Sequence, residues 1–395
     1  MQKLLDRPLL RLNPGQGRRL RSGSPWVFSN EIAMQPEYRH TPPGDLVRIE
    51  GDDGVQFGTF MFNPRSLIAA RRLDRDPAAE IDTTWVRRRL NSAIELRQRV
   101  CDTPFHRLVH AEADGLPGLV IDRYHDVVVL QANTAGMDRL TPLIVEAVAD
   151  RLRLRAVVAR NDSAARRQEG LPESVSLIMG RDARTEVVEG HVRFPVDLLG
   201  GQKTGWFFDQ RSNRDRVSAL AGGARVLDVF SHVGAFGLRC AAAGAREVTL
   251  IDSSAPALAQ AQQAAALNGV ADLVHVRRDD AFDAMGALAG ERFDIVICDP
   301  PAFARSRKDA EAGLRAYGRM ARLAAPLVAP GGFLFVASCS HHAPLEAWSA
   351  QVAWGLHRAR REGRILFTGG AGPDHPVHPH LPETAYLKTQ LIQLL

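Results

Sequence analysis

Two residues whose side chains can take part in a reaction lie at the ends of two apolar segments of this chain. The segment FDIVICDPP ends on Asp299, Pro300 and Pro301, and the segment FLFVASCS carries Cys339 near its end. If both segments are strands of one open α/β sheet, these residues lie at its carboxyl edge, where such sheets bind ligands. A carboxylate, a rigid proline backbone and a thiol at one edge suit chemistry on a planar nucleobase.

A second cysteine competes with Cys339 for a chemical role. Cys298 directly precedes Asp299, but side chains alternate along a strand, so we expect Cys298 to point into the core instead. Cys240 follows the helical period of GLRCAAAG and is also expected to be buried. The four cysteines, with Cys101 the remaining one, show neither metal-type spacing nor a disulfide framework, which fits a reducing cytoplasm.

The composition is that of a soluble protein with more than one domain. The chain has 395 residues, of which 45% are hydrophobic and 24% are charged. Lys and Arg number 50 against 45 Asp and Glu, and the preference for Arg suits phosphate and base-edge contacts, although GC-rich coding produces the same preference. No apolar run approaches membrane-spanning length, so we expect a cytoplasmic protein with no membrane partner.

The first region, residues 1–74, consists of short apolar segments broken by Pro and Gly, which predict a small β-barrel. Basic and aromatic side chains gather in its first third: Arg18, Arg19, Arg21 and Trp26. If exposed, they are suited to hold RNA phosphates and to stack on a base. The alternative is that Trp26 fills the core of the barrel.

The second region, residues 75–190, mixes helical and strand patterns. TTWVRRRLNSAIELRQRVC and MDRLTPLIVEAVADRLR have apolar residues at helical spacing, and LPGLVIDRYHDVVVLQ has the pattern of a hairpin. With the further strands AVVARN and VSLIMG, we expect an α+β domain built on an antiparallel sheet.

The third region, residues 191–395, alternates strand and helix patterns, which predicts a mainly parallel sheet. The expected strands lie in ARVLDVFSHVGAF, EVTLID, LVHVRRDDAF, FDIVICDPP, FLFVASCS and RILFTG. The expected helices are GLRCAAAG, APALAQAQQAAALNG and DAEAGLRAYGRMARLAAPLV. The final segment, AYLKTQLIQLL, is expected to be an antiparallel edge strand.

Acidic residues end three successive strands of this region and predict a cofactor. Asp228 is placed to meet a cationic group, Asp252 to bind ribose hydroxyls, and Asp280 to accept from an adenine amine. Gly234 lets a ligand approach the backbone where a helix begins, but the segment is not GxGxxG, which disfavours a dinucleotide. An adenosine bearing an amine and no phosphate fits this set, and S-adenosylmethionine is such a ligand. Each acid alone has the alternative of a helix cap or turn residue.

Six segments together resemble the signatures of one family. They are GQKTGWFFDQRSNR (201–214), LDVFSHVGAFG (227–237), CDPPAF (298–303), SCS (338–340), DHPV (374–377) and YLK (386–388). These segments resemble the ribosomal RNA large subunit methyltransferase I family, which makes 5-methylcytosine in 23S rRNA. The resemblance implies a PUA-like domain, a middle α+β domain and an α/β, Rossmann-like methyltransferase domain with a mostly parallel seven-stranded sheet. It implies 23S rRNA or a pre-ribosomal subunit as the partner, and a homodimer is compatible with it.

The resemblance also assigns residues around the cofactor. In the family, the first of these segments covers the methionine moiety, and the second forms the turn after the first strand. The cofactor residues named above are Asp228, Gly234, Asp252 and Asp280. The resemblance adds Thr204, Gly205, Phe207, Asp209, Gln210, Arg211, Phe230, Ser231 and Asp299. Arg211 offers a fork for the cofactor carboxylate, with an ion pair to Asp209 as the alternative. The chain departs from the family at two positions: it has Ser-His-Val-Gly at the turn in place of the more usual Ser-Tyr-Thr-Gly, and Ala302 where the family often has Lys.

The resemblance implies a covalent mechanism for Cys339. Carbon 5 of cytosine is a poor nucleophile until a thiolate adds at carbon 6, which makes carbon 5 able to attack the sulfonium methyl group. Asp299 would orient the base and serve as the acid partner, while Pro300 and Pro301 would shape the pocket.

Two alternatives remain open at this point. Asp-Pro-Pro followed by an aromatic residue, here Phe303, is also suited to methylating an exocyclic amine, either guanine N2 or adenine N6. The second alternative is an rRNA-binding assembly factor with no activity, which the acids at strand ends disfavour.

Overall fold

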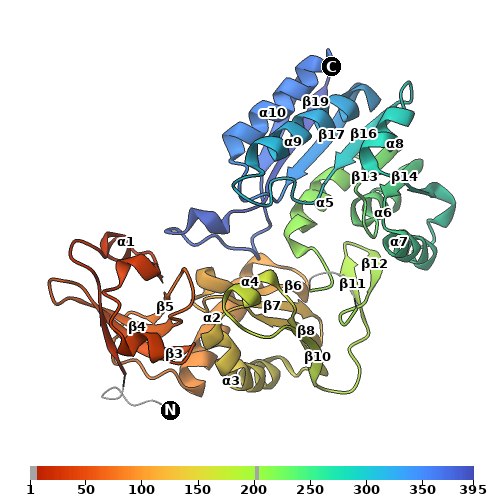
Figure 1. Ribbon diagram of the computed structural model, residues 1–395. Helices are drawn as coiled ribbons and strands as arrows, with labels where there is room; N and C mark the ends of the chain where they lie inside the picture. The colour runs from red at the N-terminus through yellow and green to blue at the C-terminus, as the bar shows by residue number, and fades with distance from the viewer. Residues whose placement is uncertain (1–6, 201–203) are drawn as a thin grey trace. The chain divides into compact units, whose positions relative to one another are not determined.

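The computed structural model describes residues 7–200 and 204–395, which fold into two compact units (Figure 1). The first unit comprises Met1–Thr185, Val196–Phe208 and Pro373–Thr384, and the second comprises Glu186–Pro195, Asp209–Gly372 and Ala385–Leu395. The first six residues of the chain and residues 201–203 of the first family segment lie outside the described residues. Among the residues described, no helix combines the length and the apolarity that crossing a bilayer requires.

The N-terminal part of the first unit is built on a five-stranded sheet. In spatial order its strands are β1 (Leu9–Arg11), β3 (Asp45–Glu50), β4 (Gln56–Phe62), β5 (Ala70–Asp74) and β2 (Trp26–Val27). An isolated antiparallel bridge joins Leu12, just after β1, to Ile32. The sequence predicts only short strands here, whereas Arg18–Arg21 forms helix α1, which starts after Gly17 in the left-handed region (φ 90°) and buries Leu20.

The rest of the first unit packs helices on a second sheet. Its elements are α2 (Thr83–Val100), β6 (Phe105–His110), β7 (Leu119–Tyr124), β8 (Val127–Ala132), α3 (Ala135–Leu152), β9 (Ala156–Asn161), α4 (Ala164–Gln168) and β10 (Ser174–Met179). The two predicted helices and the β7–β8 hairpin are confirmed. The expected antiparallel pairing is found for β9–β10, β6–β7 and β7–β8, but it is wrong for β8 and β9, which are parallel. The helix α3 joins them, and parallel neighbours need such a crossover connection.

The second unit begins with a hairpin and continues into a seven-stranded sheet. The hairpin pairs β11 (Thr185–Glu189) with β12 (Val192–Val196). In spatial order the sheet contains β15 (Val274–Arg278), β14 (Glu247–Asp252), β13 (Arg225–Val229), β16 (Phe293–Cys298), β17 (Val328–Ser338), β19 (Lys388–Leu394) and β18 (Gly363–Gly369). The mostly parallel sheet is therefore confirmed. The last strand is antiparallel as expected, but it lies between β17 and β18 and not at the edge.

Helices cover both faces of this sheet. The helices α5 (Arg211–Ser218), α6 (Ala235–Ala242) and α7 (Ala255–Leu267) pack on one face, and α8 (Ala281–Ala287), α9 (Ala310–Ala324) and α10 (Leu345–Arg358) pack on the other (Figure 1). Ser254 is the N-cap of α7, and its hydroxyl accepts from the Ala257 N–H at 3.3 Å. The sequence does not predict α5, α8 or α10. The first two are short, and α10 buries only Trp348, Val352 and Gly355, so its apolar stripe is sparse.

Candidate active site

Asp299 and Cys339 lie at the ends of neighbouring parallel strands. In the register of β16 and β17, Cys298 is level with Val336, so Asp299 leaves the sheet close to the point where Cys339 follows Ser338. Both side chains are partly buried. The structure thus brings the two sequence-predicted residues to the same edge of the sheet.

Hydrogen bonds from the two serines around Cys339 hold this segment in place. The Ser340 hydroxyl accepts from the Ala304 N–H at 3.1 Å and lies 2.9 Å from the Tyr317 hydroxyl. The Ser338 hydroxyl accepts from the Ser340 N–H at 3.3 Å. Both serines are fully buried. Because Ala304 belongs to the loop after Asp299, these bonds tie the Asp-Pro-Pro loop to the cysteine segment.

Lys388 is a residue of this site whose role the sequence does not predict. Its ammonium donates to the carbonyl oxygens of Ser340 at 2.7 Å and of Tyr386 at 2.9 Å. Burial lowers the pKa of Lys388, and the nearby Cys339 acts in the opposite direction. The available signal was a lysine at the start of the strand-like segment KTQLIQLL, since a buried ammonium needs partners.

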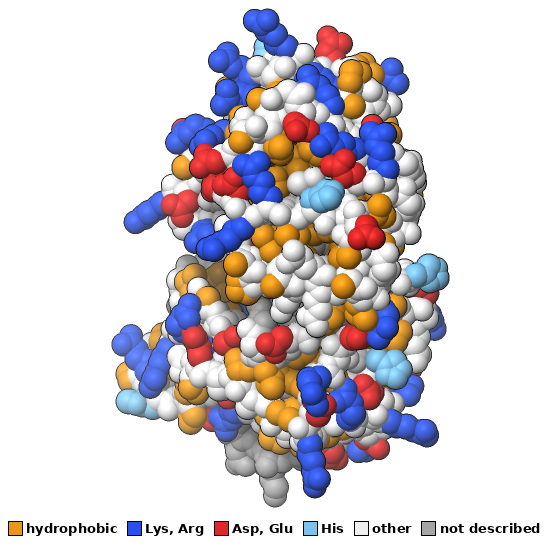
Figure 2. Space-filling view, turned by 90° about the vertical axis from the view of Figure 1, so that its right-hand side faces the viewer, with side chains coloured by type: hydrophobic (Ala, Val, Ile, Leu, Met, Phe, Trp, Pro, Cys, Tyr) orange, Lys and Arg blue, Asp and Glu red, His pale blue; other side chains and the backbone are white. Residues whose placement is uncertain are grey.

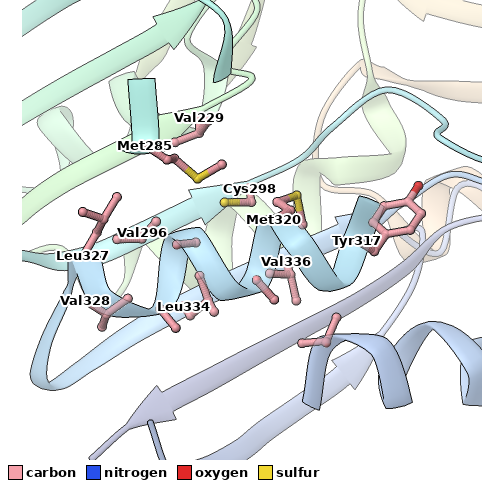
Figure 3. Packing of buried hydrophobic residues seen from close by; sticks show 14 of the residues in the cluster. Val229, Met285, Val296, Cys298, Tyr317, Met320, Leu327, Val328, Leu334 and Val336 are labelled. Carbon is pink, nitrogen blue, oxygen red and sulfur yellow. The ribbon is translucent and has the colours of Figure 1, made fainter. Parts of the chain in front are cut away.

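The two cysteines on the neighbouring elements are enclosed in the core. Cys298 belongs to the buried cluster on the α8–α9 face of the sheet, where Figure 3 shows it among Val296, Met285 and Met320. Cys240 is buried on the opposite face. Burial raises the pKa of both thiols well above the ordinary value, so neither is suited to act as a nucleophile. The expectation from strand alternation is confirmed for Cys298.

The turn after β13 has an unusual backbone. Phe230, His232 and Gly234 all have positive φ, at 62°, 51° and 73°. A bulky residue in this region is uncommon, and such residues cluster at binding sites. A Cβ atom on Gly234 would lie 2.7 Å from a methyl group of Leu250, so a larger residue there would require that side chain to shift. This turn brings the backbone close to the start of α6.

The three acids at strand ends have different surroundings. Asp228 is buried and accepts from the Gly237 N–H at 2.9 Å, and burial raises its pKa to about 8. Asp252 accepts from the N–H groups of His232 and Ser254, each at 2.8 Å. Each carboxylate oxygen has a second lone pair, so Asp252 retains capacity to accept from ribose hydroxyls.

Asp280 caps a helix, which was the alternative to a role in cofactor binding. Its Oδ1 accepts from the N–H groups of Phe282 at 2.9 Å and Asp283 at 3.2 Å, and Asp280 is therefore the N-cap of α8. The side chain is exposed and lies two residues beyond the end of β15, so contact with an adenine amine stays a prediction.

The cofactor segment after residue 203 crosses from the first unit to the second. In the first unit, Thr204 is buried and its carbonyl accepts from the Tyr124 hydroxyl at 2.9 Å. Gly205 has φ 107°, and Phe207 is partly buried. The chain returns to the second unit at Asp209, two residues after Phe207.

In the second unit, Asp209 accepts from the Tyr386 hydroxyl at 2.6 Å. The side-chain oxygen of Gln210 accepts from the Asn213 amide at 2.7 Å. The guanidinium of Arg211 lies 3.9 Å from the Glu189 carboxylate, at the limit of an ion pair.

The second unit contains polar atoms that suit a polar cofactor. Among the described residues, Oγ of Ser231 and Oδ1 of Asp209 are buried and have no hydrogen-bond partner. Leaving such atoms unsatisfied is costly, so a ligand that supplies amine or hydroxyl donors would be favoured there. Together with Asp252 and the backbone turn at Gly234, these acceptors fit S-adenosylmethionine.

The predicted RNA-binding residues of the first unit are arranged around α1. Arg18, Arg19 and Arg21 are exposed, and Arg21 pairs with Asp53 at 2.8 Å. The Trp26 indole N–H donates to Glu112 at 2.8 Å, and its ring is only partly buried. Trp26 therefore does not fill the core of the sheet, and an RNA contact by these residues stays a prediction.

Two family models match this chain. A model described as S-adenosylmethionine-dependent methyltransferase matches residues 136–357, and a model of a PUA-like domain matches residues 10–75. The match to the first region agrees with the five-stranded sheet described above.

Curated relatives match almost the whole chain. It is 35% identical to the ribosomal RNA large subunit methyltransferase of Deinococcus radiodurans, over 98% of both chains. It is also 35% identical to ribosomal RNA large subunit methyltransferase I of Aeromonas salmonicida, over 96% of this chain and 97% of the relative.

Solved structures share the fold. A SAM-dependent methyltransferase from Streptococcus mutans is similar with a TM-score of 0.81 and 19% identity, covering 98% of this chain and 100% of the other. The methyltransferase SMU.776, complexed with SAH, is similar with a TM-score of 0.83, at the same identity and coverage.

Proposed function

Because this chain belongs to the ribosomal RNA large subunit methyltransferase I family, we propose that it forms 5-methylcytosine in 23S rRNA through a covalent bond to Cys339. The family itself assigns the broader activity, which is S-adenosylmethionine-dependent methylation of large-subunit ribosomal RNA. The proposal adds the base, the ring position and the nucleophile.

The proposed reaction uses the thiolate of Cys339. The sulfur adds to carbon 6 of cytosine, which breaks the aromatic ring and places the electron pair at carbon 5. Bound S-adenosylmethionine would supply an electrophilic methyl group, and carbon 5 bonds to that methyl as its bond to the sulfonium sulfur breaks and the sulfur leaves as a neutral thioether. Loss of the proton from carbon 5 then expels the sulfur and restores the aromatic ring. The target base must leave its stack to reach the thiol.

The environment of Cys339 supports this proposal. It is a partly exposed thiol at the carboxyl edge of the sheet, whereas Cys240 and Cys298 are buried. The bonds to Ser340 hold its segment, and the Lys388 ammonium favours a thiolate by electrostatic attraction. Asp299, on the adjacent strand end, would orient the base and serve as the acid partner.

We further propose that the cofactor is bound by the strand ends and the turn of the second unit. Asp228 and Asp252 would bind the amine and the ribose hydroxyls, and the turn at Gly234 would admit the ligand to the backbone. The remaining proposed contacts are those of Thr204, Gly205, Phe207, Asp209, Gln210, Arg211, Phe230, Ser231 and Asp280.

The second candidate product is a methylated exocyclic amine. The observation that favours it is the Asp-Pro-Pro-Ala-Phe loop, in which Phe303 packs 4.8 Å from the Tyr317 ring at the same edge. In that case Cys339 would not be required. Mass spectrometry of nucleosides from methylated RNA separates 5-methylcytosine from the N2-methylguanine and N6-methyladenine products.

A trapping experiment tests the covalent mechanism. RNA containing 5-fluorocytosine keeps fluorine where the departing proton would be, so the proposed adduct persists. We expect a covalent protein–RNA species whose crosslinked peptide contains Cys339, and we expect none with Cys339→Ala. The matched control Cys298→Ala should still form it. Methylation of cytosine at the normal rate by Cys339→Ala would disprove the nucleophilic role.

A further inference from the structure

A groove between α9 and α10 carries a concentration of arginines that the proposed active site does not use. The groove has a volume of about 540 Å³. It is lined by Ala312, Arg315, Ala316, Arg319, Arg322, Gln351, Trp354 and Arg358. No acidic residue is among these lining residues, and we call this surface the arginine groove.

Helix periodicity and close packing create the arginine groove. Arg315, Arg319 and Arg322 are spaced four and three residues apart, so they lie on one face of α9. The two helices approach closely at two glycines, because a Cβ atom on Gly355 would lie 2.5 Å from the carbonyl oxygen of Gly318. Long side chains on either side of this contact therefore form raised walls.

The charges in the groove are weakly compensated. Arg315 pairs with Glu311 on its own helix, but within the described part of the chain no ion pair is formed by Arg319, Arg322 or Arg358. On the face of the molecule that Figure 2 shows, Lys and Arg side chains are interspersed with Asp and Glu, whereas no acidic residue lines the groove. The groove therefore favours a polyanion.

An exposed aromatic side chain stands among these arginines. Trp354 is 48% exposed, and the guanidinium of Arg358 lies 5.8 Å from its ring centroid. The other tryptophan of α10, Trp348, is fully buried in the core cluster, whereas Trp354 lies outside that cluster. An exposed ring beside cationic groups is the arrangement that single-stranded nucleic acids use for stacking.

The arginine groove is connected to the edge of the sheet where the reaction is proposed. The guanidinium of Arg319 lies 4.7 Å from the ring centroid of Phe282, which follows the N-cap of α8. Phe282 in turn packs against Phe230, at the turn after β13, and against Phe303, in the loop after Asp299. These contacts place the α8 side of the groove next to this edge of the sheet, so a nucleic acid bound in the groove would lie close to the target base.

We propose that the arginine groove binds a single-stranded segment of the RNA substrate next to the target base. The arginines neutralise phosphates, and Trp354 stacks on one base. This site rests on the proposed function for its ligand, an RNA with an unstacked target. It adds a binding surface in the second unit, distinct from the residues around α1.

RNA binding of charge-reversed full-length protein tests the proposal. The variant Arg322→Glu/Arg358→Glu and the variant Trp354→Ala are compared with Arg292→Glu/Arg364→Glu, which makes the same charge change at exposed residues outside the groove. Affinity for a 23S rRNA fragment is measured by fluorescence anisotropy at several KCl concentrations. Calorimetry with S-adenosylmethionine verifies that each variant is folded.

We expect the groove double variant to bind the fragment about 10-fold more weakly or worse. Its plot of log Kd against log[KCl] should be less steep by about 1.4, since each lost phosphate contact on a single strand removes about 0.7. Trp354→Ala should weaken binding roughly 10-fold without changing this slope. The control should remain within about twofold of the wild type.

Equal affinities of the groove and control variants would overturn the proposal. The binding assay involves no methyl transfer, so it tests the groove independently of the product. A product other than 5-methylcytosine would refute the proposed function, whereas the measured affinities alone would decide whether the groove binds RNA. A wild-type protein that fails to bind the RNA would refute both.

Discussion

The ammonium nitrogen of Lys388 lies 2.7 Å from the main-chain carbonyl oxygen of Ser340, the residue after Cys339. This contact exists because β19 lies beside β17, with Lys388 directly opposite Ser338. The last strand of the chain therefore helps to position the proposed nucleophile and places a cation beside it.

Replacing Lys388 with methionine should slow methyl transfer without weakening cofactor binding. Methionine keeps the length of the side chain but removes the bonds to Ser340 and Tyr386. We expect kcat to fall about 10-fold or more, because hydrogen bonds to charged groups are worth roughly 1.5–3 kcal/mol. Alkylation of Cys339 by iodoacetamide, followed by peptide mass spectrometry, should slow as well. Lys308→Met, at an exposed position, is the control, and equal rates in the two variants would contradict this role.

Replacing Cys298 with alanine should lower stability but leave the reaction intact. The residue is fully buried, so the change removes packing contacts and should reduce the free energy of unfolding by about 1–2 kcal/mol. Burial raises the pKa of this thiol, so in the folded protein it should also resist alkylation. Urea denaturation and a methylation assay measure the two effects. Loss of methyl transfer in a folded Cys298→Ala protein would contradict the assignment of Cys339 as the nucleophile.

Asp228 should make the protein less stable as the pH rises. Its pKa is about 8 in the folded state against an ordinary 3.8, so between these values the unfolded chain has lost a proton that the folded protein keeps. The free energy of unfolding should therefore fall with rising pH across this window, by at most about 1.4 kcal/mol per pH unit from this group. Asp228→Asn removes the contribution, so the stability of the variant relative to wild type should increase from pH 5 to pH 8. Urea denaturation measures the difference in free energy of unfolding between the variant and the wild type. If that difference does not vary with pH, the raised pKa of Asp228 is refuted.

Replacing Gly234 with alanine should cost more stability than the same change at Gly223. The two glycines have nearly equal φ, 73° and 70°, but a Cβ atom on Gly234 would clash with Leu250 and one on Gly223 would meet nothing within 4 Å. Gly223→Ala should cost about 1 kcal/mol, and Gly234→Ala at least about 1 kcal/mol more. Urea denaturation of both variants measures the difference. Equal losses would mean that the turn after β13 adapts to the extra methyl group.

Much of the site was predictable because local patterns determine it. An apolar run that ends in Asp299 or Cys339 must leave the sheet there, and the alternation of side chains along β16 directs Cys298 into the core. The caps of α7, Ser254 and Asn268, are likewise local features of the chain. Short helices such as α5 and α8 were missed because they contain too few turns to show a period.

The remaining features depend on contacts between distant parts of the chain. Glu189, on β11, forms a buried pair with Arg214 of α5 at 2.7 Å, although neither residue stands out in the sequence. The helix cap made by Asp280 likewise depends on where α8 begins, so the sequence left two roles open for this acid.

Local sequence patterns were sufficient to predict the class of sheet, the residues at its carboxyl edge and the family. Strand order became known only from the folded chain, in which β19 lies between β17 and β18 and brings Lys388 to Ser340, 48 residues away. The tertiary structure alone placed α9 beside α10 to form the arginine groove. The physical reason is that hydrophobic periodicity records which side of an element is buried, whereas strand order and helix pairing are set by packing among all the elements at once.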